Sequence, residues 1–234
     1  MTNVIAHRGA SRLARENTIE AFELAVAMGV DGIELDVRRS RDGRLVVQHD
    51  ARIGHTRIGG GAAIIDLDRS DLPAHIPDLH DALMACSTRI GVTVNIEIKN
   101  DADEPDYDAA RSIASNVVRE ALDVGDRERW LISSFDLAMI DAVVATGAGI
   151  ATAWLVDDVP AGAVTLLCAL GHSALHPAVE TLVRSTVDEC HDSGVAVNTW
   201  TCDDPARIRE LIGWGIDGIC TNVPDIALAV RDNM

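Results

Sequence analysis

The sequence is poor in aromatic residues and contains a single lysine, Lys99. Phe, Trp and Tyr make up only 3% of its 234 residues, whereas 47% are hydrophobic, so a folded core must consist mainly of Ala, Val, Leu and Ile. Charged residues make up 24%, a share typical of globular proteins. This composition excludes a disordered, a collagen-like or a disulfide-rich chain.

Basic residues are scarce relative to acidic ones. The chain has 20 Lys and Arg against 37 Asp and Glu, which gives a formal charge of −17. Nucleic acids and anionic membrane surfaces are bound through basic patches, so neither is an expected partner. A negatively charged small-molecule substrate would need local cations within its binding site.

Long hydrophobic runs are also missing, which argues against membrane insertion. The longest weakly polar stretch, Ala161 to Gly171, is far shorter than the ~20 residues of a membrane-spanning helix. The first residues lack the basic and apolar regions of a signal peptide.

The cysteines are odd in number and are not paired at metal-binding spacing. They are Cys86, Cys168, Cys190, Cys202 and Cys220. Free thiols indicate a reducing compartment, so we expect a cytoplasmic protein; its oligomeric state stays open.

Short β-branched runs alternate with helical patterns along the whole chain. Strands are expected at 3–6, 32–37, 92–98, 130–134, 150–155, 173–175, 195–200 and 218–221, and helices include 18–28, 78–86, 109–122 and 137–145. Eight strand–helix units predict a (β/α)₈ TIM barrel formed by residues 1–234 as a single domain. Residues 44–49 are interpreted as the return arm of a hairpin on the second strand, and a short insertion follows at 51–77.

Polar residues gather where the predicted strands end, which is the catalytic face of such barrels. Glu34 and Asp36 are two residues apart on one strand, and Glu97 and Lys99 repeat this spacing on the next. Side chains two apart in a strand share a face, here the barrel lumen. Three converging carboxylates predict a site for one hard divalent cation, Mg²⁺ or Ca²⁺ in preference to Mn²⁺ or Zn²⁺. The alternative is a buried ion-pair network that includes Arg8.

Two histidines, His7 and His49, lie beside these carboxylates. Their ordinary pKa suits a general acid and a general base near neutral pH, although they could instead be zinc ligands. Arg8 and Lys99 would hold a phosphate. Other polar residues are given structural roles: Asn17 and Thr18 as helix N-caps, and Asp42, Asp50, Asp203 and Asp217 as turn formers.

Several short motifs occur in a fixed order. They are His7-Arg8-Gly9, Glu16-Asn17-Thr18, Glu34-Leu35-Asp36, His49-Asp50, Glu97-Ile98-Lys99 and Asp217-Gly218-Ile219-Cys220-Thr221-Asn222. Together they resemble the glycerophosphodiester phosphodiesterase family over essentially the whole chain. The resemblance implies metal-dependent hydrolysis of small-molecule glycerophosphodiesters to sn-glycerol 3-phosphate and an alcohol, with attack by the substrate's own glycerol hydroxyl.

The resemblance also implies site residues. These are His7 and His49 as the acid/base pair, Glu34, Asp36 and Glu97 as metal ligands, Arg8 and Lys99 as phosphate contacts, and Phe135 and Trp200 at the mouth of the pocket. The chain departs from the family at His55, where an Arg is usual, and at Asn222, where an Asp is common and the change is expected to matter little. Which histidine is the acid, and which alcohol leaves, stay open.

Three other functions are compatible with parts of this pattern. A phospholipase D-like enzyme could use the same barrel on lysophospholipids, but it would need an apolar landing surface. A phosphate-binding protein without activity would not need the full set of catalytic residues. An aldolase or isomerase could use Lys99 to form a Schiff base, but the neighbouring Glu97 should keep this amine protonated.

Overall fold

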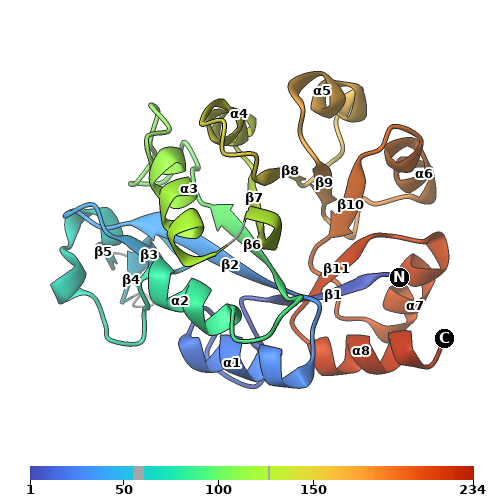
Figure 1. Ribbon diagram of the computed structural model, residues 1–234, viewed down its shortest axis with the longest axis horizontal. Coiled ribbons are helices and arrows are strands. Elements are labelled where there is room, and N and C mark those ends of the chain that lie inside the picture. Colours follow the sequence, from blue (N-terminus) through green and yellow to red (C-terminus); the bar gives the residue numbers. More distant parts are fainter. Residues whose placement is uncertain (55–60, 126) are drawn as a thin grey trace.

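The computed structural model describes residues 1–54, 61–125 and 127–234, and it confirms the predicted closed barrel of eight parallel strands (Figure 1). Strand β1 pairs in parallel with both β2 and β11, which closes the barrel. The strands of the barrel are β1 (Asn3–His7), β2 (Gly32–Arg39), β6 (Thr93–Ile98), β7 (Trp130–Ser134), β8 (Ala151–Val156), β9 (Ala174–Pro177), β10 (Ala196–Thr199) and β11 (Gly218–Thr221).

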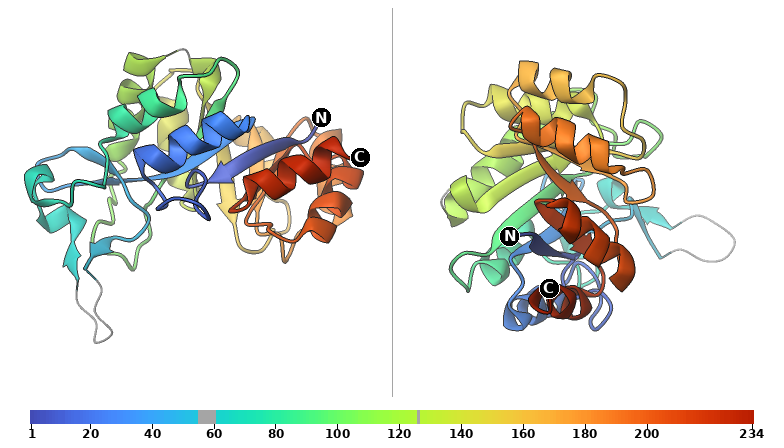
Figure 2. Two further views of the ribbon diagram at one scale, coloured as in Figure 1. Left: turned by 90° about the horizontal axis from the view of Figure 1, so that it is seen from below. Right: turned by 90° about the vertical axis from the view of Figure 1, so that its right-hand side faces the viewer.

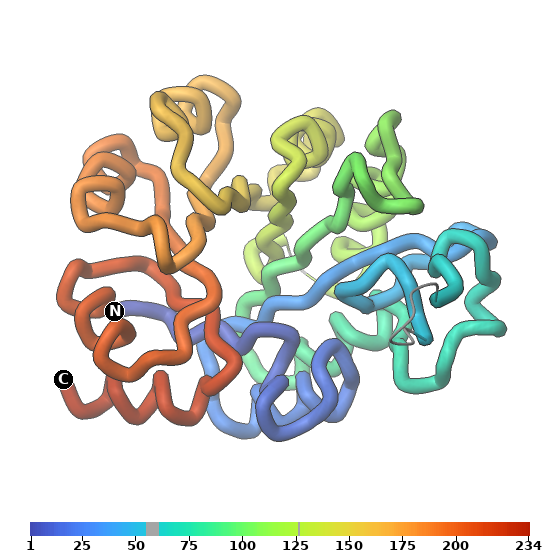
Figure 3. Tube along the Cα trace, turned by 180° about the vertical axis from the view of Figure 1, so that it is seen from behind, coloured from blue at the N-terminus to red at the C-terminus, as the bar shows by residue number. Residues whose placement is uncertain are grey.

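Helices surround the barrel on its outside, as Figures 1 and 3 show from opposite sides. They are α1 (Ile19–Met28), α2 (Leu79–Cys86), α3 (Ile113–Val124), α4 (Leu137–Ala145), α5 (Ala163–Leu170), α6 (Arg184–Asp192), α7 (Pro205–Trp214) and α8 (Pro224–Asp232). The two chain ends lie close together (Figure 2), and Arg231 of α8 forms an ion pair with Asp31, which precedes β2.

The described helices include none that is both long and apolar enough to cross a membrane.

Helix α1 shows how local sequence sets an element boundary. The side chain of Thr18 accepts a hydrogen bond from the Ala21 backbone N–H at 3.3 Å, so Thr18 is the N-cap that the sequence predicts. Gly29 ends the helix with a φ of 86°, a left-handed conformation that glycine adopts without strain.

The expected helix at 109–122 starts later than predicted. Helix α3 begins at Ile113, because Arg111 has a φ of 52° and cannot be part of a right-handed helix. The Asp108 carboxylate accepts hydrogen bonds from the Ile113 backbone N–H at 3.0 Å and the Ser112 hydroxyl at 2.8 Å. Residues 99–112 are therefore a long loop at the carboxyl end of β6.

The predicted hairpin on the second strand is confirmed. Strand β3 (Leu45–Val47) pairs antiparallel with the end of β2 and extends it beyond the barrel. In the insertion that follows, β4 (Arg52–Ile53) pairs with β5 (Ala62–Ala63), and two 3₁₀ turns, η1 (Ile64–Asp66) and η2 (Arg69–Asp71), follow. His55 lies outside the described residues.

The core is aliphatic, as the composition requires. The largest cluster of buried side chains, which joins α1, α2, α3 and α4 to the strands inside them, contains only two aromatic residues, Phe22 and Trp130. A second cluster lies under α5 to α8 and is built from Val, Leu, Ile, Ala and Cys. These clusters lie between helices and strands, whereas the barrel lumen is lined by apolar side chains, such as Ile5 and Leu155, together with polar ones.

Two neighbouring residues of α2, one buried in the core and one exposed, allow a test of this packing. Leu83 is fully buried, whereas Met84 is 52% exposed. Leu83→Ala should lower the free energy of unfolding by about 2–5 kcal/mol, because it leaves a cavity in the core. Met84→Ala should change it by less than about 0.5 kcal/mol. Urea denaturation followed by circular dichroism measures both, and equal losses would contradict the packing described here.

Candidate active site

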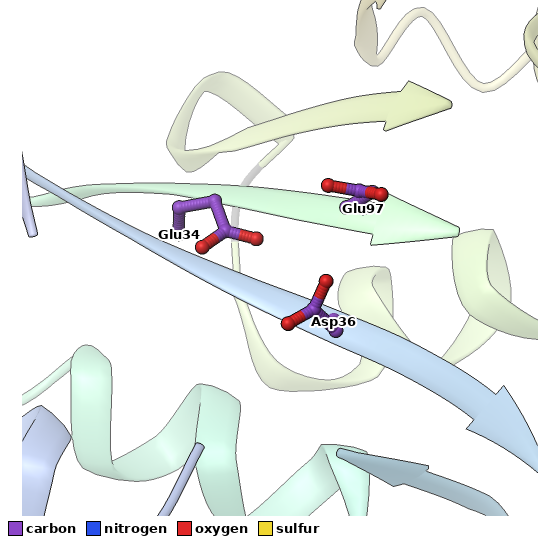
Figure 4. A group of neighbouring side chains, drawn as sticks. All are labelled: Glu34, Asp36 and Glu97. Carbon is purple, nitrogen blue, oxygen red and sulfur yellow. The ribbon is translucent and has the colours of Figure 1, made fainter. Parts of the chain in front are cut away.

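Three carboxylates converge in the barrel lumen (Figure 4). Glu34 and Asp36 project from β2 and Glu97 from β6, and one oxygen from each lies within 4.8 Å of the others. Asp36 and Glu97 are direct partners in the parallel register of the two strands. All three are buried, so the structure brings together the predicted ligand set.

Burial and mutual repulsion make this cluster electrostatically costly. Burial raises the pKa of Glu34 well above its usual range, and the charges of Asp36 and Glu97 raise it further. Burial and the charge of Asp36 likewise raise the pKa of Glu97. Burial would also raise the pKa of Asp36, but Lys99, Arg8 and other favourable contacts outweigh it and lower the value. Such a cluster requires compensating positive charge.

Two cations supply part of that compensation. The Nζ of Lys99 lies 2.8 Å from Glu97 Oε1 and 3.7 Å from Asp36 Oδ1. The Nε of Arg8 lies 3.2 Å from Asp36 Oδ2, and its backbone N–H donates to Glu34 Oε2 at 2.9 Å. Arg8 also pairs with Glu16 at 3.0 Å. Both predicted phosphate contacts thus lie against the carboxylates.

Arg8 is shared between Asp36 and Glu16, so the two cations do not fully compensate the cluster. Glu34 Oε1 is buried and has no hydrogen-bond partner among the described residues. An orphaned carboxylate oxygen inside an all-oxygen donor set fits a hard divalent cation such as Mg²⁺ or Ca²⁺. Glu34, Asp36 and Glu97 are therefore the residues that could hold such an ion.

Asn17 is not an N-cap, and this interpretation was wrong. It is buried, has a φ of 56°, and donates from Nδ2 to Asp36 Oδ2 at 2.7 Å. Its Oδ1 accepts from the Asp36 backbone N–H at 3.3 Å. Asn17 thus fixes the orientation of Asp36, a role carried by a contact 19 residues away in sequence that helix-capping rules cannot detect.

His7 is held by an amide whose own orientation is fixed. The Nδ1 of His7 lies 2.7 Å from Asn222 Oδ1, and Asn222 donates from Nδ2 and its backbone N–H to Asp203. Asp203 also accepts a hydrogen bond from the Thr221 hydroxyl. It therefore holds Asn222 in place and does more than form a turn. The other ring nitrogen of His7 lies 3.8 Å from Glu34 Oε2. The departure at position 222 therefore lies within the site.

His49 has a different partner. Its Nδ1 lies 2.8 Å from Asp50 Oδ1, so Asp50, which was expected to be a turn former, pairs with the histidine. The backbone N–H of Gln48 donates to the Asp36 carbonyl at 2.9 Å, which fixes the chain just before His49 to β2. One histidine thus faces a neutral amide and the other a carboxylate.

Aromatic side chains border the outer part of the site. Phe135 is 41% exposed and packs edge-on against Trp200, with ring centroids 5.4 Å apart. Lys99 Nζ lies 5.9 Å from the centre of the Phe135 ring. A cavity of about 620 Å³ opens here, and its lining is His49, Glu97, Ile98, Lys99, Asn100, Asp101, Ala102, Glu104, Tyr107, Arg111, Phe135, Asp136 and Asp157. We call it the outer cavity.

The sequence reasoning did not single out His176 of β9. This histidine lines the lumen together with His7, Glu34 and Glu97, and its Nε2 accepts from Asn198 Nδ2 at 2.9 Å. Burial lowers its pKa to about 3, so it is neutral in the folded protein at ordinary pH. It stands second-last on its strand, where a lone histidine gives no signal of its role.

The chain matches the Glycerophosphoryl diester phosphodiesterase family over residues 7–226. It is similar to a glycerophosphodiester phosphodiesterase from Caldanaerobacter subterraneus, with 30% identity over 96% of this chain and 95% of the relative. A solved glycerophosphodiester phosphodiesterase from Thermotoga maritima is 27% identical, with a TM-score of 0.78 over 99% of this chain and 98% of the other.

A second solved structure shares the fold. It is a phosphodiesterase from Oleispira antarctica in complex with the product sn-glycerol-3-phosphate. It is 24% identical, with a TM-score of 0.84 over 99% of this chain and 97% of the other.

The carboxylate cluster predicts stabilisation by divalent cations. Mg²⁺ or Ca²⁺ at 100 times its dissociation constant should stabilise the folded chain by about 2.7 kcal/mol, measured as a rise in melting temperature. Glu34→Gln should lose most of this gain but should be at least as stable without metal, because it removes a repelling charge. Glu23→Gln, at an exposed position on α1, is the control. A wild-type protein that responds to neither ion would contradict the metal site.

His176 predicts a loss of stability in acid. Its pKa is about 3 when folded and 6.5 in the ordinary state, so the unfolded chain binds the proton first as the pH falls. The stabilisation is complete above pH 6.5 and is lost progressively towards pH 3. Between pH 6.5 and 5 this one group should cost about 2 kcal/mol. Denaturant unfolding across this range should show a shallower fall for His176→Gln, and an unchanged slope would contradict the assignment.

Proposed function

The chain belongs to the Glycerophosphoryl diester phosphodiesterase family and is a phosphodiesterase of that class, and from this premise we propose that it hydrolyses glycerophosphodiesters to sn-glycerol 3-phosphate and an alcohol. Residues 1–234 would act as one catalytic domain. The observation that carries the proposal is the meeting of three buried carboxylates, two histidines and two cations at one end of the barrel. The product bound to the Oleispira antarctica phosphodiesterase supports it.

Glu34, Asp36 and Glu97 would hold one divalent cation, Mg²⁺ or Ca²⁺. When bound, this cation neutralises charge that develops on the phosphoryl group and lowers the pKa of a nearby hydroxyl. Arg8 and Lys99 would bind the phosphate oxygens, because they are the cations next to the carboxylates.

We assign His7 as the general base. Asp203 accepts from the amide nitrogen of Asn222, so the amide oxygen faces His7 and must accept the proton on Nδ1. The Nε2 of His7 then carries a free lone pair and points towards Glu34. It can accept the proton of the substrate's glycerol hydroxyl as that oxygen attacks phosphorus and the bond from phosphorus to the leaving alcohol breaks. Water then opens the resulting cyclic phosphate to give sn-glycerol 3-phosphate. The hydroxyl belongs to the substrate, so nucleophile and phosphorus are already close together.

We assign His49 as the general acid. The Asp50 carboxylate lies 2.8 Å from its Nδ1 and fixes the orientation of the ring. Its Nε2–H can donate to the oxygen of the leaving alcohol. His49 lines the outer cavity and His7 does not, so the outer cavity would receive the leaving alcohol, with Phe135 and Trp200 at its edge.

Three alternative functions are disfavoured by the same geometry. Most residues that line the outer cavity are charged or polar, so it suits a small polar alcohol better than the acyl chain of a lysophospholipid. A Schiff base at Lys99 requires a neutral amine, but Glu97 and Asp36 raise the pKa of Lys99 despite its burial. A protein that only binds phosphate would have no use for two histidines with different partners.

The direct test is release of sn-glycerol 3-phosphate from glycerophosphocholine and glycerophosphoethanolamine. Chelator-treated protein should be inactive, and separate additions of Mg²⁺, Ca²⁺, Mn²⁺ and Zn²⁺ should restore activity with at least one hard ion. His7→Ala and His49→Ala should each lower kcat by about 10²–10⁴-fold. His80→Ala, at an exposed position of α2, should leave kcat unchanged.

A failure to release sn-glycerol 3-phosphate with any of the four ions would contradict the proposal. Turnover of lysophosphatidylcholine without turnover of either water-soluble diester would favour the lysophospholipid reaction. Full activity in His7→Ala would contradict the assigned base.

A further inference from the structure

Arg38 of β2 is a charged side chain with no exposure to solvent. It stands two residues after Asp36, at the point where β2 leaves the barrel and enters the hairpin with β3. A buried guanidinium is stabilised when its charge is paired, although the Nη2 of Arg38 has no hydrogen-bond partner among the described residues. Its partners therefore show what it holds in place.

The guanidinium reaches in two directions. Its Nε donates to the backbone carbonyl of His49 at 2.7 Å. Its Nη1 donates to both carboxylate oxygens of Asp106, at 2.9 and 2.8 Å, and lies 2.7 Å from Glu104 Oε2. One side chain thus joins the chain at His49 to the long loop at 99–112.

That loop forms one wall of the outer cavity. Asp101, Ala102, Glu104, Tyr107 and Arg111 all line the cavity, as does His49. The loop contains no helix or strand, although backbone hydrogen bonds such as that from Tyr107 N–H to the Glu104 carbonyl shape its turns. Asp106 is almost entirely buried against Arg38. The Arg38 guanidinium is thus a direct link between His49 and this wall.

We propose that Arg38 is a positioning residue that aligns His49 with the leaving oxygen of the substrate. The proposal rests on the proposed function, because it takes His49 as the general acid. Arginine suits this task, since its rigid, planar fork carries separate donors for His49 and for the loop. A lysine has a single charged centre and cannot reproduce both contacts with the same geometry.

The chemistry gives a readout that a purely structural role would not produce. As the bond between phosphorus and the leaving oxygen breaks, the His49 proton moves to that oxygen and the alcohol departs neutral. An alkoxide such as that of ethanolamine needs this proton, whereas 4-nitrophenolate is stable without it. A misplaced His49 should therefore slow only the reaction with the poor leaving group.

The experiment compares two substrates, glycerophosphoethanolamine and the 4-nitrophenyl ester of glycerol 3-phosphate. Arg38→Lys should lower kcat for the ethanolamine diester by about 10–100-fold, with a loss below about threefold for the nitrophenyl ester. His49→Ala should show the same pattern. Because both changes affect one proton transfer, the double variant Arg38→Lys/His49→Ala should be no slower than His49→Ala alone.

Arg39→Lys is the matched control. Arg39 is the next residue of β2 and contacts Ser112 and Asp108 of the same loop, and among the described residues no hydrogen bond or ion pair joins it to His49. This variant should keep the wild-type ratio of kcat for the two substrates. Circular dichroism and melting temperature check that each variant is folded.

Asp106→Asn keeps the test decisive if Arg38→Lys does not fold. It weakens the hold on the guanidinium from the loop side and should give the same leaving-group dependence with a smaller loss. Equal losses on both substrates in a folded variant, or a double variant in which the losses multiply, would overturn the positioning role. A wild-type enzyme inactive on both substrates would instead overturn the proposed function and, with it, the premise of this proposal.

Discussion

The repulsion among three buried carboxylates is the constraint on which the site depends. Glu34, Asp36 and Glu97 lie together in a lumen shielded from water. Without compensating charges or hydrogen bonds, burial and mutual repulsion favour the protonated form of each carboxyl group. Lys99 and Arg8 provide charge, and Asn17 provides hydrogen bonds to Asp36. The negative charge of the cluster is not fully compensated, and Glu34 has a buried oxygen without a partner among the described residues. Both features suit the cluster to a divalent cation.

The two histidines owe their different character to their partners. A histidine that donates to a neutral amide keeps a free lone pair on the opposite nitrogen, whereas a carboxylate beside the ring accepts a proton from it and fixes its orientation. His7 meets Asn222, and His49 meets Asp50. The division of acid and base that we propose therefore comes from hydrogen bonds made by atoms that face away from the substrate.

Local charge prevails over global charge in this protein. The whole chain carries −17, a field that would repel a phosphodiester. The cations that would meet the substrate are held within a few ångströms of the carboxylates, where short distance and low dielectric strengthen their effect. Arg38 is a further buried charge near the site. It joins His49, the proposed general acid, to the loop that borders the outer cavity.

The order of residues along the chain was enough to predict the barrel and the convergence of its carboxylates. Alternating strand and helix patterns predicted the eight strands and the hairpin, and the period of two in a strand placed Glu34 with Asp36, because both properties depend on residues close in the chain. The roles of Asn17, Asp203 and Arg38 became evident only in the folded barrel. Asn17 meets Asp36 across 19 residues and Arg38 meets Asp106 across 68. No local periodicity records such contacts, because they exist only once the barrel has closed.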